Sequence, residues 1–477
     1  MSTPHSDFRP DRSIPKRRWL AVCCALGLSA CNLGPDYHRP ELPAPAAWSG
    51  ADAQAVAAWP SADWWRGFGS RQLDTYMTQA QRANDDLAAA IARVRQADAQ
   101  VRIAGAPLLP SLQGGFQASE QRAPVSSGGL STYAQYSPLL SASYELDFWG
   151  KNRAALNAAK ASASASRFDR VTVELTVLSG VANTYFQALE LRDRLDIAQK
   201  NLDAAQTILD GLRLEQQAGT ATALDVAQQA TTVATLYAAI PPLRQQLRQS
   251  IDALAILVGS TPESLDPKTI AAGGGLAQVS LPPVGQGLPS GLLARRPDVA
   301  EAEAQLIAAN ANVAVARAAF FPSISLTASG GYESSALSKL LNPANAIFSL
   351  AASATQPIFE GGALRGQSEL AKGRYAELLA DYHKAVISAF GNVEDALAAV
   401  QQTAEEERRQ QQAVAAARTA FEFAQAQMHA GTINVLTLLN TESALFSAED
   451  ALAQVRFSHL QALVNLYNAL GGGWQQA

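Results

Sequence analysis

The chain has 477 residues, of which 37 are Lys or Arg and 42 are Asp or Glu, and its formal net charge is −5 at pH 7. Outside Lys16-Arg17-Arg18 there is no basic run, so we expect no nucleic-acid partner. The low aromatic content of 7% favours long helices packed through small side chains over a bulky globular centre.

Residues 1–30 have the pattern of a secretory signal peptide. Lys16-Arg17-Arg18 precedes the short apolar stretch 19–28, and small residues follow it. The alternative, a transmembrane helix, is disfavoured because a bilayer crossing needs about twenty apolar residues. Leu28-Ser29-Ala30-Cys31 also resembles a bacterial lipobox, which implies lipidation of Cys31 as the first mature residue. All cysteines lie at or before Cys31, so the mature chain can form neither a disulfide framework nor a Cys-based metal site.

Residues 31–70 are expected to form a lipid-anchored linker and an equatorial segment. The linker is rich in proline and lacks hydrophobic periodicity, which is typical of an extended segment. The aromatic run at residues 63–68, Asp-Trp-Trp-Arg-Gly-Phe, comes directly before a helical pattern. We expect this run to pack against helices and not to bind a ligand.

Residues 71–259 are predicted to form a first repeat. It contains a helix, two strands at about 111–122 and 136–148, a long helix at about 151–217 and a return helix at about 222–258. Apolar and polar residues alternate in the strands, and Phe148 is the last apolar position of the second one. No proline interrupts the long helix, whereas Pro241-Pro242 are expected to break the return helix near its middle.

The same series recurs later in the chain at a constant offset. Pro110-Ser111 recurs as Pro322-Ser323, and Ala218-Gly219-Thr220 recurs as Ala430-Gly431-Thr432. Residues 260–297 are predicted to form an equatorial connector, and residues 472–477 a C-terminal tail. The second repeat, 298–471, has a helix, strands at about 323–334 and 347–359, a long helix at about 363–429 and a return helix at about 434–470.

The strands have the length and the alternation of membrane-crossing β-strands. One face of a soluble antiparallel sheet shows the same alternation, but the signal peptide, the lipid anchor and the repetition favour the membrane. Four strands cannot close a barrel, and an open sheet edge cannot lie in lipid. Several chains must therefore share one barrel, and three copies would supply twelve strands.

Each long helix is predicted to end at an Ala-Gly-Thr turn. Gly219 and Gly431 suit the left-handed conformation of a helix C-terminus, and Thr220 and Thr432 are expected to begin the return helices. Pro297 and Asp298 suit the first turn of a helix, so we prefer a structural role for the run Arg295-Arg296-Pro297-Asp298.

Several motifs resemble the outer-membrane factor lipoproteins of tripartite efflux systems, the NodT type with the TolC-like fold. The matching runs are CNLGPDYHRP at 31–40, DWWRGF at 63–68, NDDL at 84–87, LLARRPDV at 292–299 and LTLL at 436–439. The resemblance covers essentially the whole mature chain. It implies a mainly α fold with membrane β-strands, in which a homotrimer forms a twelve-stranded β-barrel and a long periplasmic α-helical barrel.

The resemblance also implies partners and a gate. The partners are a periplasmic adaptor of the membrane-fusion class, an inner-membrane pump of the RND type and outer-membrane lipid. The tip turns, Ala218-Gly219-Thr220 and Ala430-Gly431-Thr432, would face the adaptor. Leu436, Asn440 and Asp225 would line the periplasmic aperture. Relatives have Asp where this chain has Asn440 and often Arg where it has Ser443, so we expect a mainly apolar closure and not an ionic latch.

The function predicted from the sequence is therefore a passive exit duct in the outer membrane of a Gram-negative bacterium. No phosphate-binding Gly-Lys loop, metal-ligand spacing or catalytic constellation is present in the sequence, so we expect neither an enzyme nor a cofactor other than the lipid on Cys31. Two alternatives remain: a duct for type I protein secretion, and a periplasmic helical scaffold without a pore. The sequence does not identify the transported compounds.

Overall fold

The computed structural model describes residues 34–41, 48, 59–124, 128–266, 274–284 and 289–475. The predicted signal peptide and Cys31 lie outside these residues. The chain divides into two compact units. The first is drawn from 1–38, 98–162 and 306–378, and the second from 39–97, 163–305 and 379–477.

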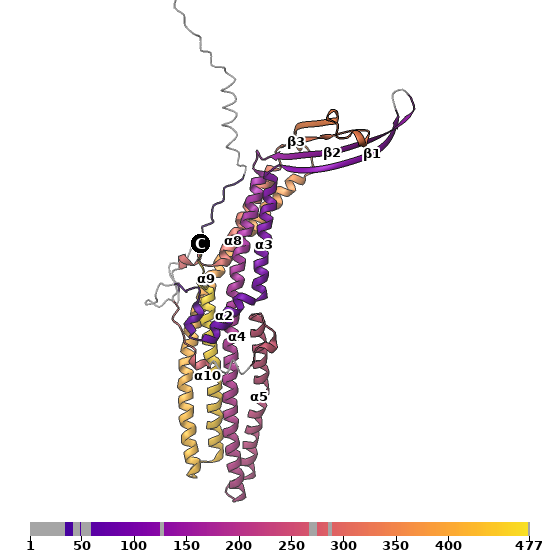
Figure 1. Ribbon diagram of the computed structural model, residues 1–477. Helices are drawn as coiled ribbons and strands as arrows, with labels where there is room; N and C mark the ends of the chain where they lie inside the picture. The colour runs from indigo at the N-terminus through magenta and orange to yellow at the C-terminus, as the bar shows by residue number, and fades with distance from the viewer. Residues whose placement is uncertain are drawn as a thin grey trace, which may run out of the picture. The chain divides into compact units, whose positions relative to one another are not determined.

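The first unit contains a four-stranded antiparallel sheet (Figure 1). Its strands are β1 (Ser111–Pro124), β2 (Leu130–Leu146), β3 (Ser323–Tyr332) and β4 (Ala346–Thr355), in the spatial order β1-β2-β3-β4. Two strands come from each half of the chain, and the pairing of β2 with β3 joins the halves. Both edge strands, β1 and β4, have one side without a partner strand in the described protomer.

The register of the sheet brings the apolar positions of all strands onto one face. Successive rows across the sheet alternate in character, because side chains of neighbouring positions in a strand point to opposite faces. One row consists of Leu112, Ala142, Ala328 and Leu350, and the next consists of Gln113, Ser141, Ser329 and Ser349. The apolar face is uncovered in the protomer, where Phe348 on β4 is 90% exposed.

The strands differ from the ranges expected from the sequence, β1 and β3 by two residues at one end and β2 and β4 by more. β2 begins earlier, at Leu130, and ends at Leu146, so the prediction that Phe148 belongs to the strand is wrong. The Asp147 carboxylate instead accepts hydrogen bonds of 2.9 Å from the backbone N–H groups of Asn152 and Arg153, and so caps the following helix. β4 ends at Thr355, shortly before Pro357, which has no N–H to donate to a strand ladder.

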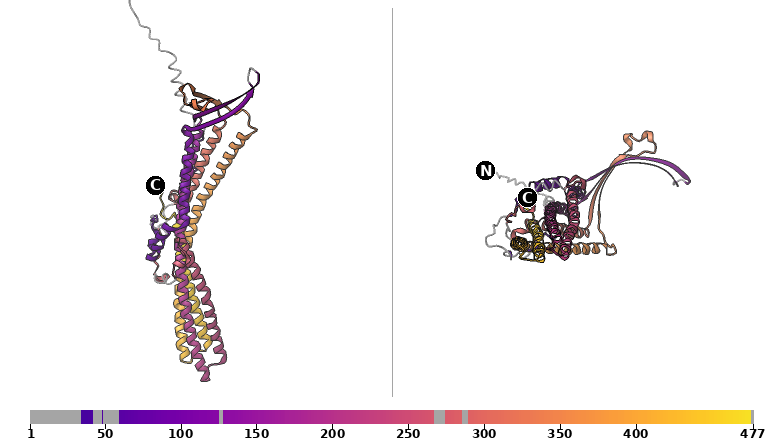
Figure 2. Two further views of the ribbon diagram at one scale, coloured as in Figure 1. Left: turned by 45° about the vertical axis from the view of Figure 1, so that its right-hand side comes forward. Right: turned by 90° about the horizontal axis from the view of Figure 1, so that it is seen from below.

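Two very long helices are α4 (Lys151–Gln217) and α9 (Ala363–His429), of 67 residues each. At a rise of about 1.5 Å per residue, each is about 100 Å long. Their return helices are α5 (Ala223–Leu257) and α10 (Val435–Ala469). Within the second unit, α5 and α10 and the adjoining parts of α4 and α9 form two hairpins that lie side by side (Figures 1 and 2).

The predicted break at Pro241-Pro242 is wrong, because α5 continues through both prolines. Each proline removes one helix hydrogen bond, and the carbonyls that lose a donor belong to Tyr237 and Ala238. Both of these residues are exposed, so water can satisfy the carbonyls. The buried side chains of Ile240 and Leu243 flank the prolines and hold the helix in place.

The apolar core of the second unit contains the aromatic run predicted to pack against helices. Trp64 and Phe68 belong to η1 (Trp64–Phe68), and both are buried. The Trp64 ring stacks on Tyr467 of α10 at 5.0 Å between ring centroids, and Phe68 lies 5.0 Å from Phe186 of α4. The run therefore fastens the linker to the helices.

The remaining elements are short or lie at the borders of the units. They are α2 (Arg71–Ala83), α3 (Asp85–Gly105), η2 (Ala106–Leu108), η3 (Pro262–Ser264), η4 (Leu276–Gln278), α7 (Pro289–Leu292), α8 (Pro297–Ala318), η5 (Leu337–Lys339) and η6 (Pro343–Asn345). The prediction that Pro297 begins a helix with Asp298 in its first turn is confirmed. Among the described residues, no helix has both the length and the apolar character required to cross a membrane.

Candidate functional site

The two Ala-Gly-Thr turns have the same backbone geometry. Gly219 has φ of 79° and Gly431 has φ of 68°, so the predicted left-handed conformation is confirmed at both positions. Residues with a Cβ rarely adopt this conformation, which explains glycine at the turn. A Cβ added to either glycine would meet no atom within 4 Å, so the constraint comes from the backbone and not from crowding.

Each turn threonine caps the helix that precedes it. The backbone N–H and the hydroxyl of Thr220 donate to the Glu215 carbonyl at 2.9 and 3.0 Å. Thr432 makes the same two bonds to the Gln427 carbonyl, at 3.0 and 3.1 Å. The prediction that these threonines begin the return helices is therefore wrong, because their hydrogen bonds satisfy carbonyls at the end of the outgoing helix.

The return helices begin with their own caps. Thr222 and Asp225 form a reciprocal capping box at the start of α5, in which the Asp225 carboxylate accepts from the Thr222 N–H at 2.9 Å and from its hydroxyl at 2.7 Å. These bonds hold the pKa of Asp225 below its ordinary value. At the start of α10, Asn434 accepts from the Thr437 N–H at 3.0 Å. Asp225 thus caps its own helix, and its place in the aperture stays a prediction.

The first turns of α10 have one exposed face and one buried face. Leu436 and Asn440 are one helical turn apart and both exposed, with Leu436 at 51%. Val435 and Leu439 lie on the neighbouring, buried face and pack against Leu212 of α4. The geometry therefore presents Leu436 and Asn440 together, as an aperture lining requires, but the lining role itself stays a prediction.

The sequence patterns did not point to a second exposed leucine at the tip. Leu224 is the second residue of α5, as Leu436 is the second residue of α10, and Leu224 is 65% exposed. The constant offset between the repeats is the signal that could have identified it. The protomer thus presents one exposed leucine at the start of each return helix.

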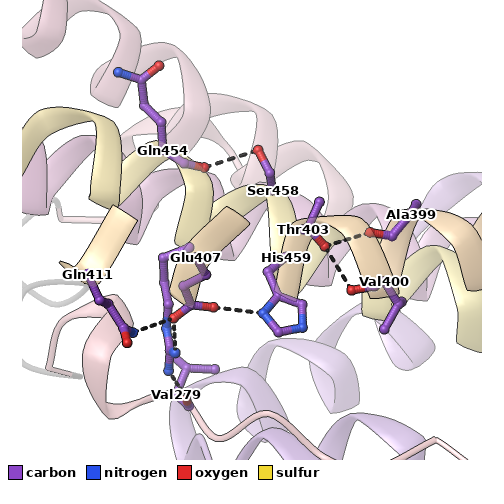
Figure 3. Close-up of polar contacts among 10 residues, drawn as sticks. Val279, Ala399, Val400, Thr403, Glu407, Gln411, Gln454, Ser458 and His459 are labelled. Atoms are coloured by element: carbon purple, nitrogen blue, oxygen red, sulfur yellow. Dashed lines mark hydrogen bonds and ion pairs between the residues drawn. The ribbon is translucent and has the colours of Figure 1, made fainter. Parts of the chain in front are cut away.

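A buried ionic network joins α9, α10 and the connector between the repeats (Figure 3). Glu407 of α9 contacts His459 Nδ1 at 2.7 Å and accepts from Arg456 Nη1 at 2.5 Å, both on α10. Arg456 also donates to the Val279 carbonyl of the connector at 2.9 Å. Burial raises the pKa of Glu407, but the hydrogen bonds from His459 and Arg456 lower it more, so it lies below its ordinary value.

A second network links the two hairpins. Arg194 of α4 donates to Asp450 of α10 at 2.6 and 3.2 Å and to Glu190 of its own helix at 3.1 Å. Both networks join residues that are distant in sequence, so periodicity could not reveal them. No cluster of three or more His, Cys, Asp or Glu side chains that could hold a metal ion occurs in the described part of the chain.

Comparison with known proteins decides the family. A sequence profile described as "Outer membrane efflux protein" matches residues 77–260 and 288–472, which together are most of the chain. The chain belongs to the outer membrane efflux protein family. The two matched blocks correspond to the two halves that share the tip turns and the long helices.

Individual relatives of this efflux protein match it over almost their full length. It is 42% identical over 465 residues to the pyoverdine export outer membrane protein OpmQ of Pseudomonas aeruginosa, covering 96% of each chain. It is 32% identical over 457 residues to the cation efflux system protein CusC of Escherichia coli K12, covering 95% of this chain and 99% of CusC. The solved CmeC outer membrane channel of Campylobacter jejuni superimposes with a TM-score of 0.87 at 25% identity, covering 94% and 96% of the two chains.

These similarities confirm the principal predictions made from the sequence. The efflux protein has the TolC-like fold, and it is the outer-membrane channel component of an efflux system that extends into the periplasm. The family and the fold are those of channel proteins. The family model and the named relatives therefore favour an efflux channel over the two alternatives, a duct for type I secretion and a scaffold without a pore.

Proposed function

We propose that three copies of this efflux protein form one passive, gated exit duct. The observation that carries the proposal is the sheet with two unpaired edges and one apolar face. The backbone groups of β1 and β4 need partners, because unpaired N–H and C=O groups are costly in hydrocarbon. In a ring of copies, β4 of one protomer pairs with β1 of the next, and the apolar face meets lipid.

The long hairpins continue this duct into the periplasm. The α4 and α9 helices and their returns supply four rods per protomer at the level of the tips. Their length of about 100 Å suits a tunnel that extends far beyond the thickness of a bilayer, whose hydrocarbon core is about 30 Å. Packing between neighbouring hairpins then closes the wall of the tunnel.

The tips serve as the gate in this proposal. Leu224 and Leu436 are exposed in the protomer, and in a ring of three copies they narrow the opening. Asn440 and Ser443 carry no charge, so closure is apolar and lacks an ionic latch. The glycine turns at Gly219 and Gly431 lie at the moving ends and contact a periplasmic adaptor, which favours the open state.

The energy for transport comes from a partner. No phosphate-binding Gly-Lys loop is present in the sequence, so we assign energy coupling to an inner-membrane pump of the RND type and no enzymatic activity or cofactor to this chain. OpmQ exports pyoverdine and CusC belongs to a cation efflux system, although both match this chain over nearly all of its length. We therefore assign the choice of cargo, a small molecule, to the pump. Cys31 carries the covalent lipid that anchors the chain.

Planar-bilayer recording on the purified full chain tests the duct. We expect a detergent-resistant trimer that gives steady unit conductance. A second sample, with Leu326→Asp on the apolar face of β3, should insert poorly, because a charge on the lipid-facing side of a membrane strand is destabilising. A matched change on the polar face, Thr327→Asp, should leave insertion intact. A stable monomer without conductance would contradict the proposal.

A further inference from the structure

A buried acid lies near the tip without a charged partner. Glu442 is on α10 and Gln229 is on α5, and both side chains are fully buried, at 0% exposure. Neither carboxyl oxygen of Glu442 has a hydrogen-bond partner in the structure. A buried carboxylate in that condition is strongly disfavoured, so the neutral acid is the form that suits this site.

The Gln229 amide is oriented to receive a proton donor. Its Nε2 donates to the Ala205 carbonyl of α4 at 2.8 Å, which identifies Oε1 as the remaining acceptor. Gln229 Oε1 is buried and has no partner either. An ionised Glu442 could not pair with it because both groups only accept, whereas a protonated Glu442 can donate to it.

The place of Glu442 connects this pair to the tip packing. Glu442 follows Val435 and Leu439 on the buried face of α10, one turn beyond Leu438. Val435 and Leu439 pack against Leu212 of α4. A change in how α10 packs at Glu442 therefore acts on the helix segment that presents Leu436.

No charged side chain offsets the burial of Glu442. Burial raises its pKa to about 7. The charged groups that the four tip helices carry nearby are exposed or engaged elsewhere. Asp210 of α4 accepts hydrogen bonds from Gln206 and Arg213, and Asp225 of α5 accepts one from Thr222. Glu449 of α10 accepts one from Arg418 of α9, and Glu422 of α9 is exposed.

We propose that Glu442 is a positioning residue of the gate, whose protonated carboxyl donates to Gln229 and locks α10 against α4 and α5. Loss of the proton leaves a buried charge without a partner and loosens the start of α10. Because the folded-state pKa is raised, the stabilisation of the packed tip is complete at acidic pH and is lost as pH rises through about 7. The inference rests on the proposed gate only for its effect on conduction.

Infrared titration of the full chain in lipid nanodiscs tests the proton. A protonated-carboxyl band should disappear in the wild type as pH rises through about 7, and Glu442→Gln should lack that component. Gln229→Met removes the acceptor that stabilises the protonated acid, so the midpoint should move to lower pH. The matched control Glu422→Gln changes an exposed acid of α9 and should keep the wild-type band. A wild-type spectrum identical to that of Glu442→Gln across the range would overturn the proposal.

Hydrogen exchange of the first turns of α10 tests the lock itself. After correction for the intrinsic pH dependence, exchange in the wild type should rise by up to tenfold per pH unit as pH increases toward about 7 and level off above it, whereas exchange in Glu442→Gln should stay flat. An equal rise in both proteins would overturn the proposal. If the band and the exchange behave as expected but single-channel conductance does not follow pH, the proposal for Glu442 stands and the gate assignment fails.

Discussion

Arg194 and Asp450 connect the two halves of the protomer by two hydrogen bonds, of 2.6 and 3.2 Å. Arg194 lies on α4 of the first hairpin and Asp450 on α10 of the second, so the pair resists separation of the hairpins. The two N–H donors of the Arg194 guanidinium match the two carboxylate oxygens of Asp450. This pairing fixes the relative orientation of the two side chains as well as the distance between them.

Asp450→Asn should weaken this link without changing the shape of the side chain. Both partners are partly exposed, so we expect a coupling energy of only about 1 kcal/mol. A double-mutant cycle with Arg194→Gln, read out from the thermal unfolding of the helices, measures it. The coupling should fall at high salt, and a value near zero at low salt would contradict the assignment.

Leu436→Ser should widen the aperture and raise permeability to bulky antibiotics. Leu224→Ser should act in the same direction, and the double variant should exceed either one, because each return helix presents one exposed leucine. Antibiotic susceptibility and unit conductance measure the effect. Ile256→Ser is the control, since Ile256 is 66% exposed but lies at the far end of α5. Unchanged leakage in the double variant would show that these leucines do not line the opening.

Glu407→Gln should destabilise the packing of α9, α10 and the connector at neutral pH. Because the pKa of Glu407 lies below its ordinary value, its charge stabilises the fold above about pH 4.5 and this contribution is lost as pH falls through the lowered pKa. Removing one member of a buried ion pair costs about 3 kcal/mol. Thermal unfolding midpoints at several pH values should converge for wild type and variant in acid. Glu422→Gln, an exposed change on the same helix, should show no such pH-dependent difference.

Cys31→Ala should abolish lipid attachment and leave a poorly anchored precursor. Labelling with radioactive palmitate measures acylation, and membrane fractionation measures anchoring. Changing Cys23 and Cys24 to Ala together is the matched control and should leave both unaffected. Palmitate incorporation at the wild-type level in Cys31→Ala would refute the lipobox assignment.

Part of the tip could be predicted from the sequence because it depends on short-range geometry. Gly219 and Gly431 were expected in the left-handed conformation, which the structure has at both places. The roles of Thr220 and Thr432 were mistaken, since a threonine after a glycine can cap the helix behind it or the helix ahead. Only the observed bonds to the Glu215 and Gln427 carbonyls distinguish the two possibilities.

The sequence by itself determined the repeated order of elements, the long uninterrupted helices and the alternation of the strands. These features depend on proline, glycine and polarity at positions only a few residues apart. The tertiary structure alone decided the pairing of β2 with β3, the contact of Arg194 with Asp450 and the burial of Glu442 beside Gln229. Each of these depends on which distant segments pack together, and local periodicity carries no information about such pairings.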